Sequence, residues 1–325
     1  MALSNNAARR AADRHGHWMT TTSNASPPRI WAIGGGKGGV GKSVLAVNLA
    51  ITLARRGLDV TLIDMDLGGA NDHTLLGMPP PRRRLEDFLE RRAGALADAI
   101  TPTGTGGLGL IAGSGFGGAN TPYAQKERLI RHLRKLPTRY VLLDLGAGTA
   151  YNVLDFFVAA DLGIVVTVPE HTSVENANAF LRAAFFRRLA RSPETRPVRD
   201  LVRELFRPSG NGASPSPRQV LESPDALLAE AARRANAALA GFRPAIVVNQ
   251  VRLPREQELP AQMAGAVREY FGIGAFGAGA LPSDRLVTQS VRDRRPVVEA
   301  YPGGAFSSGV ATVAETLLAG GGRHG

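Results

Sequence analysis

The segment RIWAIGGGKGGVGKS, residues 29–43, joins a short apolar run to a glycine-rich loop that ends in Lys42 and Ser43. The apolar residues 29–33 are typical of a buried strand, and a helical pattern follows over residues 43–56. The loop between them fits the pattern GxxxxGK[ST]. A strand, such a loop and a helix in this order predict a binding site for nucleotide phosphates at the start of the helix.

The loop supplies different chemical groups for different parts of a nucleoside triphosphate. Its glycines let successive backbone N–H groups converge on phosphate oxygens, and the Ser43 hydroxyl is a ligand for Mg²⁺. Lys42 neutralises the β and γ phosphates and is therefore predicted to be catalytic. The predicted nucleotide-binding residues of the loop and the first helical turn are Gly36, Gly38, Gly39, Val40, Gly41, Lys42, Ser43 and Val44.

A dinucleotide site is an alternative for the same segment. The glycines of residues 34–39 also satisfy GxGxxG after a strand, and Asp64 ends the next strand, as a ribose-binding acid would. However, Lys42 and Ser43 have no task in dinucleotide binding, whereas both have one in triphosphate binding. The triphosphate interpretation is therefore favoured.

Lys37 places a second cation in the loop, five residues before Lys42. The loop pattern does not require a lysine there, and most backbone paths point its side chain away from the loop's own nucleotide. The chain has 39 Lys and Arg residues but only four lysines, so half of its lysines lie in this loop. A compact ammonium group suits a crowded phosphate site better than a planar guanidinium. We therefore predict that Lys37 is catalytic and reaches phosphate bound by a second copy of the chain.

Further apolar runs predict strands that are buried on both faces, because they are nearly continuous in Val, Ile and Leu. Helical patterns separate them, which indicates a parallel sheet joined by right-handed crossovers. A capping box predicts one of these helices over residues 172–189. The predicted fold is α/β: a three-layer phosphate-loop NTPase fold with a mostly parallel central sheet flanked by helices. The strands predicted after the first are residues 59–64, 108–112, 140–144, 163–168 and 245–249.

We predict a single phosphate-loop domain over residues 29–319. Residues 1–28 are polar, aperiodic and slightly basic, which predicts a disordered arm. Residues 191–240 mix a segment rich in Pro, Ser and Gly with an alanine-rich helix, and we interpret them as an insertion at the rim of the sheet. Residues 320–325 are rich in glycine and are predicted to be a flexible tail.

Three acidic residues follow predicted strands, where a metal ion and a water molecule would be held. Asp64 and Asp66 leave one strand at positions i and i+2, and Asp144 ends another. We predict that Asp64 and Asp144 hold Mg²⁺ together with Ser43. Asp66 is predicted to be catalytic, because a second carboxylate there can orient or deprotonate the attacking water. Two alternatives stay open: solvated acids in a turn, and a helix-capping role for Asp144.

Glycine-containing loops follow both acidic strand ends, at residues 67–71 and 146–148. Glycine lets the backbone approach a phosphate closely and change conformation. We predict that these loops rearrange when the γ-phosphate leaves, which would make the protein a switch.

Asn249 is the last residue of the predicted strand 245–249. Its side-chain amide both donates and accepts hydrogen bonds, as N6 and N7 of adenine require, and we predict that it binds the base. Residues 281–284 follow another strand, and Pro282 is predicted to close over the purine. Both segments are also typical of turns, and that alternative stays open.

The composition limits the functional classes. The absence of cysteine excludes disulfides, thiolate metal sites and iron–sulfur ligation. No apolar run approaches the roughly 20 residues that span a bilayer, and we expect a soluble, cytoplasmic protein. The formal charge of +11 favours affinity for polyanions such as nucleic acid or acidic lipid.

The chain resembles the deviant phosphate-loop ATPases of the MinD/ParA class in residues 37–43, 63–71 and 143–148. Within the class, the likeness is greatest to flagellar number regulators of the FlhG type. The resemblance covers residues 30–190 and 245–315, and the segments Val168-Pro169-Glu170 and Pro282-Ser283-Asp284 also match the family's pattern.

This resemblance implies an ATP-dependent homodimer that holds two nucleotides between its subunits. It implies that Lys37 reaches the phosphates in the facing subunit, that Glu170 and Pro282 belong to the nucleotide site, and that ATP hydrolysis dissolves the dimer. The favoured function is an ATP-hydrolysing switch that positions or counts a cellular structure through partner proteins. The alternative is a ParA-like partition ATPase that binds DNA nonspecifically.

The chain departs from the family's pattern in three respects, one of which is that residues 1–28 lack the short glutamine-containing activator motif typical of flagellar regulators. Membrane-binding members end in a basic amphipathic helix, whereas the tail here is rich in glycine, so membrane attachment is not expected. The segment 191–240 is not a usual part of the family and offers a surface for an unidentified protein partner.

Overall fold

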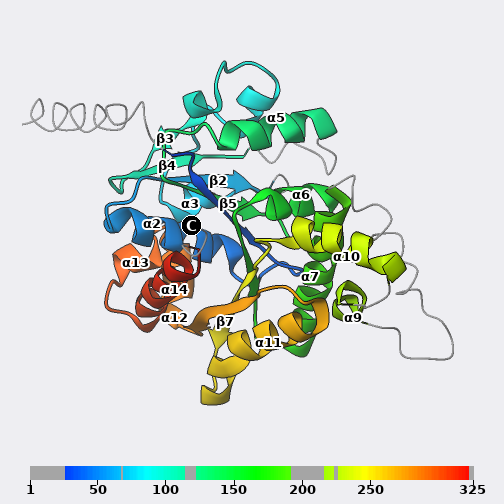
Figure 1. The fold of residues 1–325 in the computed structure, drawn as a ribbon. Helices are drawn as coiled ribbons and strands as arrows, with labels where there is room; N and C mark the ends of the chain where they lie inside the picture. The colour runs from blue at the N-terminus through cyan, green and yellow to red at the C-terminus, as the bar shows by residue number, and fades with distance from the viewer. Residues whose placement is uncertain (1–25, 67–68, 114–121, 192–215, 223–225, 322–325) are drawn as a thin grey trace, which may run out of the picture.

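The computed structural model describes residues 26–66, 69–113, 122–191, 216–222 and 226–321. Most of the predicted N-terminal arm, the middle of the predicted insertion and the last four residues lie outside these ranges, as do Leu67 and Gly68 of the predicted switch loop. The described ranges contain one eight-stranded sheet with helices on both faces (Figure 1).

The sheet has the strand order β3-β4-β2-β5-β1-β6-β7-β8. Neighbouring strands are parallel except for β3 and β4, which pair antiparallel at one edge. This confirms the predicted mostly parallel sheet. The strands are β1 Arg29–Gly34, β2 Val60–Met65, β3 Thr101–Pro102, β4 Leu108–Ile111, β5 Tyr140–Leu145, β6 Leu162–Thr167, β7 Ala245–Val251 and β8 Phe276–Pro282.

The central strands are mostly apolar because helices cover both faces of the sheet. In β1, Ile30 and Ala32 pack on one face and Trp31 and Ile33 on the other. The first face is covered by α4, α5, α6, α7, α10 and α11, and the second by α2, α13 and α14 (Figure 1). The three predicted layers are therefore confirmed.

The helices have the following bounds: α2 Lys42–Arg55, α3 Asp72–Leu75, α4 Leu85–Leu89, α5 Tyr123–Leu133, α6 Tyr151–Ala159, α7 His171–Arg191, α9 Pro217–Leu221, α10 Ala226–Leu239, α11 Leu259–Phe271, α12 Arg285–Arg292, α13 Val297–Ala300 and α14 Ala305–Gly321. Two 3₁₀ turns, η1 Leu96–Ala99 and η3 Pro254–Glu258, complete the described elements. No helix within the described ranges combines the length and the apolar character that crossing a bilayer requires.

The predicted capping box at the start of α7 is wrong. The carbonyl of Glu170 accepts hydrogen bonds from the N–H groups of Ser173 and Val174, so the helix begins at His171. The box Thr172-Ser173-Val174-Glu175 would need Thr172 as the N-cap, but Thr172 already lies inside α7.

Two helices of the segment 191–240 belong to the packed structure. Ala235 and Leu239 of α10, together with Leu221 of α9, are buried in the same core as α7 and α11. The described part of this segment therefore extends the helical layer on one face of the sheet.

Candidate functional site

The predicted site residues gather at one edge of the sheet. Parallel strands end at the same edge, and the order β2-β5-β1-β6-β7-β8 places the ends of these six strands side by side. Along that edge lie, in turn, Asp64 on β2 and Asp66 directly after it, Asp144 on β5, the phosphate loop after β1, Glu170 after β6, Asn249 on β7 and Pro282 on β8.

The phosphate loop has a conformation that only small residues permit. Gly39 and Gly41 have φ angles of +78° and +91°, which lie in the left-handed region. A Cβ atom at Gly36 would also collide with the backbone carbonyl of Asn176 on α7. No side chain caps the start of α2, so its first N–H groups are available to an anion.

Lys42 lies inside the loop. Its Nζ donates to the backbone carbonyl of Lys37 at 3.2 Å, and the residue is 8% exposed. Burial lowers the pKa of the Lys42 ammonium, whereas the nearby carboxylates of Asp144 and Asp66 raise it. The side chain thus carries its charge into the space that the loop surrounds, as the neutralisation of phosphate requires.

Lys37 takes the opposite direction. Its Nζ lies 3.1 Å from Glu170 Oε2, and the two side chains are 41% and 64% exposed. The two lysines of the loop are therefore separated: Lys42 is directed inward and Lys37 lies at the rim.

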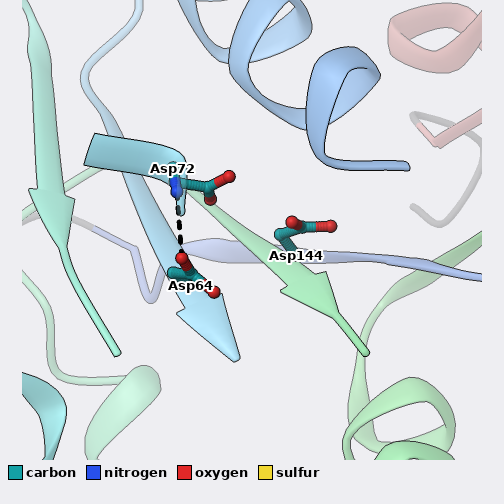
Figure 2. A group of neighbouring side chains, drawn as sticks. All are labelled: Asp64, Asp72 and Asp144. Atoms are coloured by element: carbon teal, nitrogen blue, oxygen red, sulfur yellow. Dashed lines mark hydrogen bonds between the residues drawn. The ribbon is translucent and has the colours of Figure 1, made fainter. Parts of the chain in front are cut away.

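Three carboxylates converge beside the loop (Figure 2). Asp64 and Asp144 are direct register partners on the neighbouring strands β2 and β5. Asp72, the first residue of α3, joins them, so that one oxygen of each carboxylate lies within 4.8 Å of the others. The exposed fraction of each of the three residues is at most 1%.

The pKa values of these acids are raised because burial disfavours their charged forms. Burial raises the pKa of Asp64 to about 6, although its carboxylate accepts hydrogen bonds from the N–H groups of Asp66 and Asp72. Burial also raises the pKa of Asp144 to about 7, against the opposing effects of a hydrogen bond from Ser43 and the charge of Lys42. A group of acids in this condition favours either a bound cation or bound protons.

Asp72 was not predicted from the sequence. The interpretation of residues 67–71 as a loop stops one residue before it, and no spacing rule relates Asp72 to Asp64, eight positions earlier. Its pKa is raised well above the ordinary value, first by burial and then by the charges of Asp144 and Asp64. Only the three-dimensional fold brings it to the site.

Asp66 lies against the second predicted switch loop. A Cβ atom at Gly146 would be 3.3 Å from Asp66 Oδ1, and the N–H of Gly148 donates to the carbonyl of Gly35 at 3.1 Å. The loop after β5 is therefore in contact with both a predicted catalytic acid and the first turn of the phosphate loop.

Asn249 is buried and braces the phosphate loop. Its Nδ2 donates to the carbonyl of Val40 at 2.9 Å, and its Oδ1 accepts from the N–H of Gln250 at 2.9 Å. A Cβ atom at Gly41 would collide with the same Nδ2, which is a further reason for glycine there. An amide can make four hydrogen bonds, so these two contacts leave one donor and one acceptor position of the Asn249 side chain unused.

Pro282 ends β8 and pairs in register with Val251 of β7, the strand that carries Asn249. The next residues turn into α12, where the Asp284 carboxylate accepts a hydrogen bond from the N–H of Leu286 and caps the helix. Asp284 therefore serves as the N-cap of α12, a position that aspartate commonly occupies.

A profile of the CobQ/CobB/MinD/ParA nucleotide binding domain matches residues 31–297, which is most of the chain. The chain belongs to this family. Membership confirms the resemblance to the MinD/ParA class and identifies the matched residues as a nucleotide-binding domain.

Three MinD/ParA relatives illustrate the likeness. The antiactivator FleN of Pseudomonas aeruginosa is 28% identical over 304 residues, which cover 92% of this chain and 89% of FleN. The flagellum site-determining protein YlxH of Helicobacter pylori is 29% identical over 169 residues, 49% of this chain and 54% of that protein. The structure of the septum site-determining protein MinD from Pyrococcus horikoshii, complexed with Mg-ADP, is 19% identical with a TM-score of 0.58, and the match covers 91% of this chain and 100% of that one.

Proposed function

We propose that this chain is a Mg²⁺-dependent ATPase that forms a homodimer with ATP and returns to monomers after hydrolysis. The observation that carries the proposal is the division of labour between the two lysines of the loop. Lys42 is buried and directed inward, whereas Lys37 is held at the rim by Glu170, where a second copy of the chain can meet it.

The residues present fit a magnesium ion. Mg²⁺ prefers oxygen ligands from carboxylates, hydroxyls, water and phosphates. Ser43 stands at the start of α2, and Asp64 and Asp144 lie on neighbouring strands beside it. Oδ1 of Asp144 is buried without a hydrogen-bond partner among the described residues, so its lone pairs are available to a cation. When bound, Mg²⁺ would neutralise charge on the phosphate oxygens.

The chain's own groups then divide the work of hydrolysis. The backbone N–H groups of the loop, with Ser43 and Val44 at the start of α2, bind and orient the phosphates. Lys42 and the facing subunit's copy of Lys37 stabilise negative charge on them. Asp66 orients or deprotonates the attacking water, and Asn249 and Pro282 hold the adenine base.

The switch is proposed to act in the cytoplasm, where ATP is available, on the position or number of a cellular structure. FleN, which matches nearly the whole chain, is an antiactivator, and YlxH is a flagellum site-determining protein. These relatives support a role through a partner protein. The segment 191–240, within one domain over residues 29–319, is the proposed partner surface.

Partition of DNA is the second candidate function, and the formal charge of +11 is the observation that favours it. A dimer that neutralises DNA phosphates would bind without sequence preference and would lose affinity steeply with salt.

The two functions are separated by two measurements on the full chain. Light scattering after gel filtration should give a monomer without nucleotide or with ADP, and a dimer with ATP and Mg²⁺. A chain that stays monomeric with saturating ATP would contradict the switch. Retardation of random duplex DNA is then measured across a salt series: ATP-dependent retardation at low salt would favour partition, and its absence would dismiss it.

A further inference from the structure

Asp72 adds a third carboxylate to the pair formed by Asp64 and Asp144. Figure 2 shows its side chain extending from the start of α3 towards Asp144, with Asp64 below it. One oxygen of each residue lies within 4.8 Å of the others. Oxygen ligands lie about 2.0–2.1 Å from Mg²⁺ and about 2.3–2.6 Å from Ca²⁺, so the ligand atoms of one divalent ion are at most about 4–5 Å apart. The spacing therefore fits one ion that contacts all three acids.

Among the described residues, no N–H group or cationic side chain compensates the burial of Asp72, and the side chain that faces its carboxyl group is the carboxyl group of Asp144. The residue is fully buried, and neither of its carboxylate oxygens has a hydrogen-bond partner among the described residues. Oδ1 of Asp144 is in the same condition. A buried carboxylate without a donor or a cation is costly. The two residues thus direct unsatisfied oxygens into one small space.

The main chain holds this arrangement in place. Asp64 and Asp144 are fixed by the parallel register of β2 and β5. The N–H of Asp72 donates to Asp64 Oδ2 at 3.1 Å, which ties the start of α3 to the end of β2. These are contacts of the main chain with the chain's own groups, and none of them needs a phosphate oxygen to place the ligand atoms.

We propose that Asp64, Asp72 and Asp144 form a divalent-cation site that fills without nucleotide, with Asp72 as its third ligand. The cation is a hard ion that prefers oxygen, such as Mg²⁺ or Mn²⁺. The inference rests on the proposed function, because Asp64 and Asp144 belong both to the Mg²⁺ site proposed for ATP hydrolysis and to this three-acid site. It goes further, because a site that needs no phosphate oxygen supplies the cation in advance of ATP.

The test uses Mn²⁺ as the probe. The full chain is freed of cations and nucleotide with EDTA and gel filtration, and then titrated with Mn²⁺ while electron paramagnetic resonance reports the free ion. We expect one Mn²⁺ per wild-type chain. Asp72→Asn should bind it at least about tenfold more weakly, since even outer partners of a metal site contribute that much. Asp59→Asn is the matched control, because exposed Asp59 lies at the opposite end of β2.

Two results would overturn the proposal: no Mn²⁺ binding by the nucleotide-free wild type, or equal binding by wild type and Asp72→Asn. Circular dichroism checks that the variant folds, and Asp72→Ala replaces it if it does not. ATP hydrolysis with Mg²⁺ is measured in parallel. If the chain hydrolyses ATP but does not bind Mn²⁺ in the absence of nucleotide, only the proposed three-acid site is overturned. If the chain binds Mn²⁺ but does not hydrolyse ATP, only the proposed function is overturned.

Discussion

The ammonium group of Lys37 lies 3.1 Å from the carboxylate of Glu170, which precedes α7 and is 133 residues further along the chain. Both side chains are substantially exposed, so this ion pair contributes at most about 1 kcal/mol to stability. The ion pair matters because it fixes the position of the Lys37 side chain. Lys37 is kept away from the interior of its own loop, and a weak contact of this kind is easily exchanged for the phosphate of a facing subunit.

Replacement of Lys37 by alanine tests that exchange. We expect Lys37→Ala to bind ATP with nearly unchanged affinity, because Lys42 still neutralises the phosphates, but to hydrolyse it at least about a hundredfold more slowly, since a lost charge contact in a transition state costs that much. Fluorescent nucleotide binding and phosphate release measure the two properties. Lys135→Ala, which removes an exposed lysine elsewhere, is the control. Unaltered turnover in Lys37→Ala would remove its role across the dimer.

Asp66 is expected to separate dimer formation from hydrolysis. Asp66→Ala should retain ATP binding but lose the group that orients water, so the dimer should persist long after the wild type has returned to monomers. Light scattering followed over time after a single addition of ATP and Mg²⁺ measures this. If the variant and the wild type return to monomers at the same rate, Asp66 does not act on the water.

The phosphate loop and the strand ends were predictable because their signals are local: a glycine pattern next to a strand, and acids at the ends of apolar runs. Asp72 was not predictable, because its burial depends on how α3 folds back onto the end of β2. The Asn249 contact with Val40 joins residues 209 positions apart and leaves no periodic trace in the sequence. The start of α7 was also misplaced, because the local capping pattern favours Thr172 as the N-cap, whereas the helix begins at His171.

Asn249 has a structural contact with the phosphate loop and a proposed contact with adenine. The binding of ATP and of GTP by one variant, Asn249→Ala, separates the two contacts. Asn249→Ala removes the hydrogen bond to Val40 and should weaken binding of any nucleoside triphosphate through the loop. Because it also removes the proposed adenine contact, we expect ATP binding to weaken at least about tenfold and the preference for ATP over GTP to narrow, since an unpaired base edge costs about 1–3 kcal/mol. Calorimetric titration with both nucleotides measures the ratio. Equal losses for ATP and GTP would leave Asn249 with the loop contact alone.

Asp155 on α6 is expected to be important for stability. It lies 2.5 Å from the ammonium of Lys126 on α5 and 2.6 Å from the guanidinium of Arg187 on α7, and its side chain is 1% exposed. Asp155→Ala would leave Lys126 buried without its counter-ion, which typically costs about 3–5 kcal/mol. Urea unfolding measures the loss. Glu315→Ala, which removes an exposed ion pair with Arg56, is the control and should cost less than about 1 kcal/mol. If the two variants lose similar amounts of unfolding free energy, the burial of the Asp155 ion pairs does not make them more important for stability than an exposed pair.

The raised pKa values of the acid cluster predict how stability depends on pH. The folded chain raises the pKa of Asp64 to about 6 and that of Asp144 to about 7, above the ordinary value of 3.8. A group whose pKa is higher in the folded state binds its proton more tightly there, so its contribution to stability is complete below about pH 4 and is lost as the pH rises through 6 and 7. In EDTA and without nucleotide, the melting temperature should therefore contain a component that falls between pH 5 and pH 8.

Asp144→Asn isolates that component, because an amide has no proton to lose in this range. The variant should gain stability relative to the wild type as the pH rises from 5 to 8, by on the order of 1–3 kcal/mol at pH 8, since one pKa unit corresponds to about 1.4 kcal/mol. Asp59→Asn, with the same chemical change at an exposed position, should follow the wild-type curve. Differential scanning calorimetry in EDTA measures all three proteins. If the Asp144→Asn curve runs parallel to that of the wild type, Asp144 is ionised throughout this range and its pKa is not raised by the fold.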